Sequence, residues 1–227
     1  VYKVLELTPN VEKLTMLNIE VGEKTLEENS EETLHENLTL NRLNEIILDD
    51  GDNVDCLKLI ATHFKVNISS LKCRLTTYAQ LPILEQILVS SNDLKSLEIS
   101  SECDAVFPLS DDAEIKFQLD KLIIKSPLLK FNEQLAKFLA SQQTLKEIGF
   151  ISSHVDYRYH NTIFRILPAL RKLHLNIDTF ATNDCLNKLK RTPANPLVRS
   201  LYISGKNLHI NVFEEVIRMF PKLRSLN

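Results

Sequence analysis

The chain is poor in the residues that most enzyme and membrane-protein signatures require. Only 4 of its 227 residues are glycine, and they form neither a phosphate-binding loop nor a G-x-S-x-G turn. No apolar run approaches the ~20 residues of a membrane-spanning helix. With 27 basic and 30 acidic residues the formal net charge is -3, which does not favour a nucleic-acid partner. We therefore expect a soluble protein that binds neither membrane nor nucleic acid.

Redox and metal-binding motifs are also missing. The chain has 4 cysteines, Cys56, Cys73, Cys103 and Cys185. They form no C-x-x-C pair, so we expect reduced thiols in a cytoplasmic or nuclear protein. The histidines include no H-E-x-x-H pair, and His154, Asp156 and His160 form their closest group. We interpret this group as surface residues of a loop, with an enzyme built on it as an alternative. No catalytic residue, metal ligand or cofactor is predicted otherwise.

One short apolar phrase recurs along the whole chain, with apolar residues at its first, fourth and sixth positions. Its fourth-position residues are Leu14, Ile46, Leu71, Leu97, Leu122, Ile148, Leu173, Leu201 and Leu226. The steps between them are 32, 25, 26, 25, 26, 25, 28 and 25 residues. A period in the twenties that carries L-x-x-L-x-L is typical of leucine-rich repeats. Such repeats cannot bury their apolar faces alone and stack on one another.

Each repeat predicts a strand followed by a helix. The fourth and sixth residues of the phrase lie two apart, so on a strand they point to the same face. The segments between phrases have helical spacing, as in residues 131–139, where Asn132 is a candidate cap. Comparable stripes are Val54, Leu57, Ile60, Ala61 and Phe64; Leu81, Leu84, Ile87 and Leu88; and Phe213, Val216, Ile217 and Phe220. We predict an α/β leucine-rich repeat solenoid, a horseshoe with parallel strands on the concave face and helices on the convex face.

The repeat is already under way at Val4 and Leu5, and the chain stops at Asn227, one residue after Leu226. Solenoids normally end in a cap that shields the last core layer. We therefore expect residues 1–227 to form a single domain of about nine repeats that is truncated at both ends.

The amino-acid sequence of the repeats resembles that of a known family. Three repeats enter the strand through a Pro-x-Leu/Val-x-x-Leu phrase, at residues 9–14, 168–173 and 221–226. With the repeat length and the alternation of strand and helix, this phrase resembles the leucine-rich repeat domains of eukaryotic F-box proteins, and residues 5–14 are similar to divergent insect members. The resemblance implies the substrate-recruiting part of an F-box subunit of a Skp-cullin ubiquitin ligase.

The F-box module itself is not present in this segment, so a Skp-type adaptor would bind only through a module upstream. The alternative is an intracellular leucine-rich repeat scaffold or inhibitor without a ubiquitin link. The turns also depart from the family pattern. Thr76, Glu102 and Pro127 stand where many leucine-rich repeats have Asn or Cys, so we expect irregular turns.

Two insertions interrupt the period. Residues 20–36 carry seven glutamates and one lysine, which predicts a solvated loop, with a partner-binding loop as the alternative. Residues 100–116 carry five carboxylates but lack the ordered D-x-D-x-D-G pattern of a calcium loop. We expect this second stretch to be held to the core by Val106, Phe107 and Leu109.

The residues that alternate with the core leucines identify the opposite, concave face of the strands. This face is the one extended surface that the architecture offers to a partner, so we predict that a protein substrate binds there. Its candidate binding residues are Lys13, Glu45, Asp49, Lys72, Arg74, Glu98, Lys121, Lys125, Glu147, Lys172, His174 and Tyr202. Ile123 and Gly149 also fall on this face. The mixture of charges favours a protein over a nucleic acid.

Overall fold

The structure is a computed structural model. It describes residues 10–17, 42–49, 57–58, 60–61, 68–102, 107–110, 112–127, 132–151, 167–176, 187, 190–191, 193–205 and 209–227. The chain divides into two compact units. The N-terminal unit comprises Val1–Ser96 and Pro108–Phe117, and the C-terminal unit comprises Leu97–Phe107 and Gln118–Asn227. The acidic stretch 20–36 and the group of His154, Asp156 and His160 lie outside the described residues.

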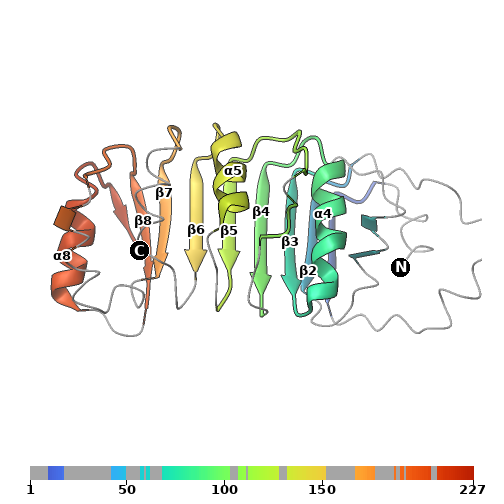
Figure 1. Ribbon diagram of the computed structural model, residues 1–227, viewed down its shortest axis with the longest axis horizontal. Helices are drawn as coiled ribbons and strands as arrows, with labels where there is room; N and C mark the ends of the chain where they lie inside the picture. Colours follow the sequence, from blue (N-terminus) through green and yellow to red (C-terminus); the bar gives the residue numbers. More distant parts are fainter. Residues whose placement is uncertain are drawn as a thin grey trace, which may run out of the picture. The chain divides into compact units, whose positions relative to one another are not determined.

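Nine strands form one parallel sheet in sequence order (Figure 1). They are β1 (Lys13–Leu17), β2 (Glu45–Asp49), β3 (Ser70–Leu75), β4 (Ser96–Ser101), β5 (Lys121–Lys125), β6 (Glu147–Ile151), β7 (Lys172–Asn176), β8 (Ser200–Ser204) and β9 (Ser225–Leu226). Every strand begins one residue before the fourth-position residue of a repeat phrase, as the L-x-L spacing predicts. The predicted fold class is confirmed, because a sequential parallel sheet of this kind is consistent with a leucine-rich repeat solenoid.

The core residues of the phrase are aligned from strand to strand. In the C-terminal unit Leu122 pairs with Ile148, Ile148 with Leu173, and Leu173 with Leu201. All are buried, with exposed fractions of 0 to 2%. In the N-terminal unit Cys73 stands at a leucine position and is 1% exposed, as expected for a small thiol in an apolar core.

A shared backbone carbonyl joins a repeat to the next at seven of the steps between strands. The carbonyl oxygen of the residue directly before a strand accepts hydrogen bonds from two successive N–H groups of the following repeat, at 2.7 to 3.2 Å. A carbonyl oxygen has two lone pairs, so it can satisfy both donors. These acceptors are the carbonyls of Glu12, Asn44, Ser69, Asp120, Lys146, Arg171 and Arg199. The arrangement fixes where each strand starts relative to its neighbour.

The helix of the N-terminal unit follows a short 3-10 turn. That turn, η1 (Tyr78–Gln80), leads into α4 (Leu81–Ser90), which has Pro82 in its first turn. Proline suits this position, because the first N–H groups of a helix need no partner within it. The helix buries Leu84, Ile87 and Leu88, and these are residues of the predicted stripe. The stripe around Leu57 and Ile60 is also buried at both of those residues.

In the C-terminal unit, α5 (Glu133–Ser141) lies on one face of the sheet beside β5 and β6 (Figure 1). The Asn132 side chain accepts a hydrogen bond from the Leu135 N–H at 2.9 Å, which confirms the predicted cap. The helix buries Leu135, Phe138 and Leu139. These residues are the apolar face that the sequence predicts.

The predicted face of the last helix is confirmed at two of its four residues. Helix α8 (Ile210–Arg218) buries Val216, and Phe220 just after the helix is also buried, as predicted. Val212 is buried as well, whereas Phe213 and Ile217 are only partly covered. Met219, directly after the helix, is also buried. Val212, Val216 and Met219 stand at i, i+4 and i+7, so they complete a helical face of their own. Both stripes are apolar in the sequence, and packing selects between them.

The stretch after β4 is anchored as predicted. In the C-terminal unit Phe107 is buried, and its ring centroid lies 4.8 Å from that of Phe138. In the N-terminal unit Leu109 is buried, and the neighbouring Ser110 N–H donates to Glu85 Oε1 at 2.7 Å. Val106 lies outside the described residues. No helix in the described part of the chain is both long enough and apolar enough to cross a bilayer.

The register generates a stability prediction. We expect Leu122→Ala to lower the free energy of unfolding by about 2 to 5 kcal/mol, because it leaves a cavity in the core. Lys121→Ala, one residue away, should lower it by less than about 1 kcal/mol, because that side chain is partly exposed. Urea unfolding followed by circular dichroism measures both, and equal losses would contradict the register.

Candidate functional site

The strand face opposite the core, called here the display face, carries the candidate binding residues of both units. In the N-terminal unit they form solvated pairs: Lys13 Nζ lies 2.8 Å from Glu45 Oε2, and Arg74 Nη1 lies 3.6 Å from Asp49 Oδ1. All four side chains are at least 36% exposed, so each pair contributes little to stability. Lys72, on β3, is partly buried.

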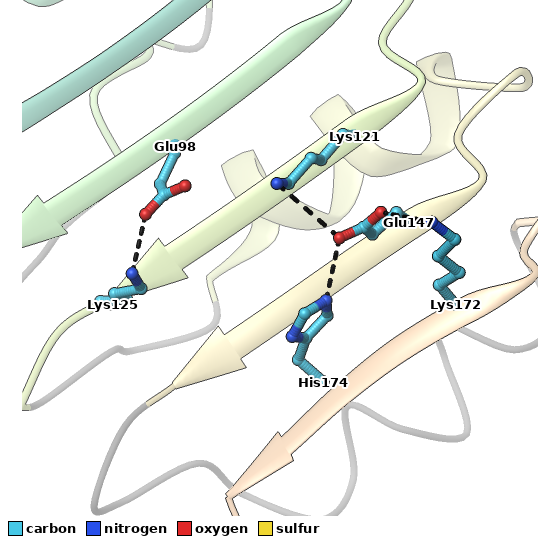
Figure 2. A network of polar contacts seen from close by, with 6 residues as sticks. All are labelled: Glu98, Lys121, Lys125, Glu147, Lys172 and His174. Carbon is cyan, nitrogen blue, oxygen red and sulfur yellow. Dashed lines mark hydrogen bonds and ion pairs between the residues drawn. The ribbon is translucent and has the colours of Figure 1, made fainter. Parts of the chain in front are cut away.

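In the C-terminal unit the candidate residues converge on one carboxylate (Figure 2). Glu147 on β6 accepts from His174 Nε2 at 3.0 Å, and its oxygens lie 3.8 Å from Lys121 Nζ and 3.4 Å from Lys172 Nζ. A carboxylate only accepts, so His174 Nε2 is the donor of this hydrogen bond. Beside this cluster, Lys125 Nζ donates to Glu98 Oε1 at 2.7 Å. The partners of Glu147 thus come from two strands, β5 and β7, and strands β4 and β5 form the second pair.

The two signs of charge lie at different depths. Glu147 and Glu98 are 16% and 18% exposed, whereas Lys121, Lys125 and Lys172 are 37%, 42% and 49% exposed. Long lysine stems can cover apolar surface while their ammonium groups stay in water. Both signs of the expected mixture are present in this unit, with the lysines in the outer layer and the carboxylates recessed beneath them.

Two display-face residues are buried, contrary to the expectation for that face. Ile123 is 3% exposed, and Gly149 is buried beside it. Ile123 on β5 pairs with Gly149 on β6. Two residues earlier along these strands Lys121 pairs with Glu147, and two residues later Lys125 pairs with Ile151. Residues with large neighbours on all sides lose their solvent contact even on an uncovered face. Ile123 and Gly149 therefore form an apolar floor under the charged layer.

Gly149 allows the side chains on the strands on either side of it to lie close together. Ile123, Gly149, His174 and Tyr202 stand in one row across β5 to β8, called here the central row. A Cβ at Gly149 would lie 2.8 Å from His174 Cβ and 2.8 Å from Ile123 Cδ1, both closer than van der Waals contact. The missing side chain lets His174 approach β6 and reach Glu147. On its other side the His174 ring stacks on Tyr202, with centroids 4.3 Å apart and planes at 6°.

The surroundings of Glu147 change its acidity. Burial alone would raise the pKa of this carboxyl group, because it disfavours the charged form. The hydrogen bond from His174 and the positive charges of Lys121 and Lys172 outweigh burial, so the pKa is lowered. Glu147 is therefore ionised at neutral pH.

An open depression lies at the carboxyl ends of β4 to β7. It has a volume of about 310 Å³ and is lined by Ser100, Ser101, Lys125, Ser126, Pro127, Ile151 and Asn176. Lys125 is the one charged residue among the described residues that line it, and it is already bonded to Glu98. Among the residues that the structure describes, no group of three or more His, Cys, Asp or Glu side chains could hold a metal ion.

Sequence reasoning placed Gly149 on the display face but gave it no role. The available signal was its position, because a glycine inside a strand often marks close approach of a neighbour. The pairing of Lys121, Lys172 and His174 with one carboxylate required the strand register, which relates side chains from separate repeats.

The glycine generates a packing prediction. Gly149→Ala should destabilise the protein by about 1 to 3 kcal/mol, because the added methyl group overpacks the row. Adding Ile123→Val removes the Cδ1 that the new methyl group meets, so the double variant should recover part of the loss. Thermal unfolding tests this coupling. Simple additivity of the two changes would show that the contact is not as described.

The lowered pKa of Glu147 generates a pH prediction. A carboxyl group with a lower pKa in the folded state binds fewer protons there than in the unfolded chain, so it stabilises the fold above the unfolded value of about 4.3. That contribution is lost as the pH falls through the folded value. Glu147→Gln should therefore flatten the pH dependence of the unfolding free energy in this acidic range. The exposed Glu214→Gln on α8 is the control, and an equal flattening in both variants would refute the assignment.

No family model matches this chain, and no curated protein matches it. The resemblance to F-box proteins therefore depends on the sequence pattern of the repeats alone. What the sequence and the structure establish together is a parallel sheet of nine sequential strands, consistent with a repeat solenoid.

Proposed function

We propose that this chain is a protein-recognition domain that binds its partner on the display face of β5 to β8. The observation that carries the proposal is the ordered polar layer around Glu147, set on the apolar floor of Ile123 and Gly149. A partner would meet side chains that are already held in place, which reduces the conformational entropy that binding costs.

The residue types on this face also support protein binding. His174, which stacks on Tyr202, shares the Glu147 carboxylate with Lys121 and Lys172, whose side chains are partly exposed. Tyrosine is enriched among residues that dominate binding energy, because it buries apolar area and keeps a polar hydroxyl group. The neighbouring depression is open, whereas small-molecule sites usually enclose their ligands.

We further propose that the domain recruits substrates for a Skp-cullin ubiquitin ligase, with catalysis supplied by other subunits. This finer proposal is supported by the resemblance of the repeats to those of F-box proteins. Co-precipitation of the full-length protein with a Skp-type adaptor tests it directly. Capture of partners on the display face without adaptor binding would favour a scaffold or inhibitor instead.

Site-specific photo-crosslinking tests the binding face. A benzoylphenylalanine residue in place of Tyr202 should form adducts with partner proteins in cell lysate, because Tyr202 lies on the proposed surface. The same substitution at Tyr78, which is 58% exposed on η1, is the matched control and should form no shared adduct. Mass spectrometry identifies the products. Adducts of one partner at Tyr78 but not at Tyr202 would contradict the proposal.

A further inference from the structure

Four basic residues stand in a column at the start of β6 to β9. Lys146, Arg171, Arg199 and Arg224 each occupy the position directly before a strand. They are joined in sequence by backbone hydrogen bonds: Arg171 N–H to Lys146 O at 2.8 Å, and then Arg199 and Arg224 N–H to the preceding carbonyl at 2.7 Å. Neighbouring members are therefore about 4.8 Å apart along the sheet. We call these residues the basic column.

The column is confined to the C-terminal unit. The corresponding positions of the N-terminal unit, before β1 to β4, are Glu12, Asn44, Ser69 and Lys95. Since both units repeat the same backbone hydrogen bonds, the fold does not require basic residues at this position. The basic side chains of the column are therefore free to serve binding instead of folding.

Two of the three arginines donate hydrogen bonds to backbone carbonyl oxygens. Arg171 Nη1 donates to Leu170 O at 2.8 Å, and Arg199 Nη1 donates to Lys222 O at 3.2 Å. Within the described part of the chain, Arg171, Arg199 and Arg224 form no ion pair with a carboxylate, whereas Lys146 pairs with Asp120 at 2.7 Å. A guanidinium group has five N–H donors, so donors remain for a ligand.

The surroundings of the column add further positive charge. Lys172 and Lys222 are exposed beside it, while the nearby carboxylate of Glu147 is recessed and already paired. This edge of the C-terminal unit is therefore basic, although the whole chain has a formal net charge of -3. A ligand that suits it is an anion able to contact several strands.

Two kinds of polyanion could fit, and the observations favour a protein. The negative net charge of the chain opposes long-range attraction of nucleic acid. Arginine pairs with carboxylates through two parallel hydrogen bonds, which adds geometric specificity to charge. We propose that the basic column binds an acidic, extended segment of a protein partner, with its carboxylates on Arg171, Arg199 and Arg224. This inference rests on the proposed function, since it names the chemistry of the partner.

The test measures binding of a fluorescent peptide of alternating glutamate and serine by anisotropy, at about 0.15 M salt to screen distant charges. The column variant combines Arg171→Glu, Arg199→Glu and Arg224→Glu. The control variant combines Lys137→Glu, Lys190→Glu and Arg191→Glu, which changes the net charge equally at exposed sites. The wild type and the control should bind the peptide, and the column variant should bind at least about 10-fold more weakly. Circular dichroism confirms that all three proteins fold.

Three outcomes would overturn the inference. They are no peptide binding by the wild type, equal losses in the column and control variants, and tighter column-dependent binding of a single-stranded oligonucleotide than of the peptide. The crosslinking at Tyr202 separates this inference from the proposed function. Adducts at Tyr202 together with any of these three outcomes would leave protein recognition standing and remove only the acidic partner.

Discussion

The shared backbone carbonyl is the interaction on which the rest of the structure depends. Each one receives two N–H groups from the following repeat, so the start of one strand determines the start of the next. Because residues alternate between the two faces of a strand, a slip of one residue would exchange the core and the display face. Leu122 and Lys121 keep their separate environments only while this alignment holds.

The same alignment gathers groups that are distant in the sequence. Glu147 meets lysines from the strands on either side and a histidine from one of them. The lysine side chains are partly exposed, so each ion pair contributes little to stability by itself. The cluster depends on the strand register that brings these groups together. Gly149 is part of this arrangement, since the space it leaves allows His174 to lie beside β6.

Much of the fold could be predicted from the repeat, because the L-x-L spacing states directly which residues share a face. Every strand and the cap at Asn132 followed from such local patterns. The burial of Ile123 did not, because it depends on the side chains of neighbouring repeats. The buried face of α8 was predicted only in part, since its neighbouring positions are all apolar and only packing distinguishes Val212 from Phe213.

The candidate site was predicted in part for a similar reason. The display-face residues were identified by alternation along each strand, but the grouping around Glu147 needs the register between strands. Arg171 and Arg199 were overlooked because they precede the strands and so fall outside the alternating pattern. A residue there is recognised only when the repeats are aligned on one another.

The repeats differ in length, yet their strands remain aligned. The step from β7 to β8 is longer than the step from β6 to β7, but His174 pairs with Tyr202 as regularly as Gly149 pairs with His174. Extra residues are therefore absorbed in the connections and leave the strands in place. A connection can therefore gain residues, and with them new surface, without displacing the rows of side chains on the sheet.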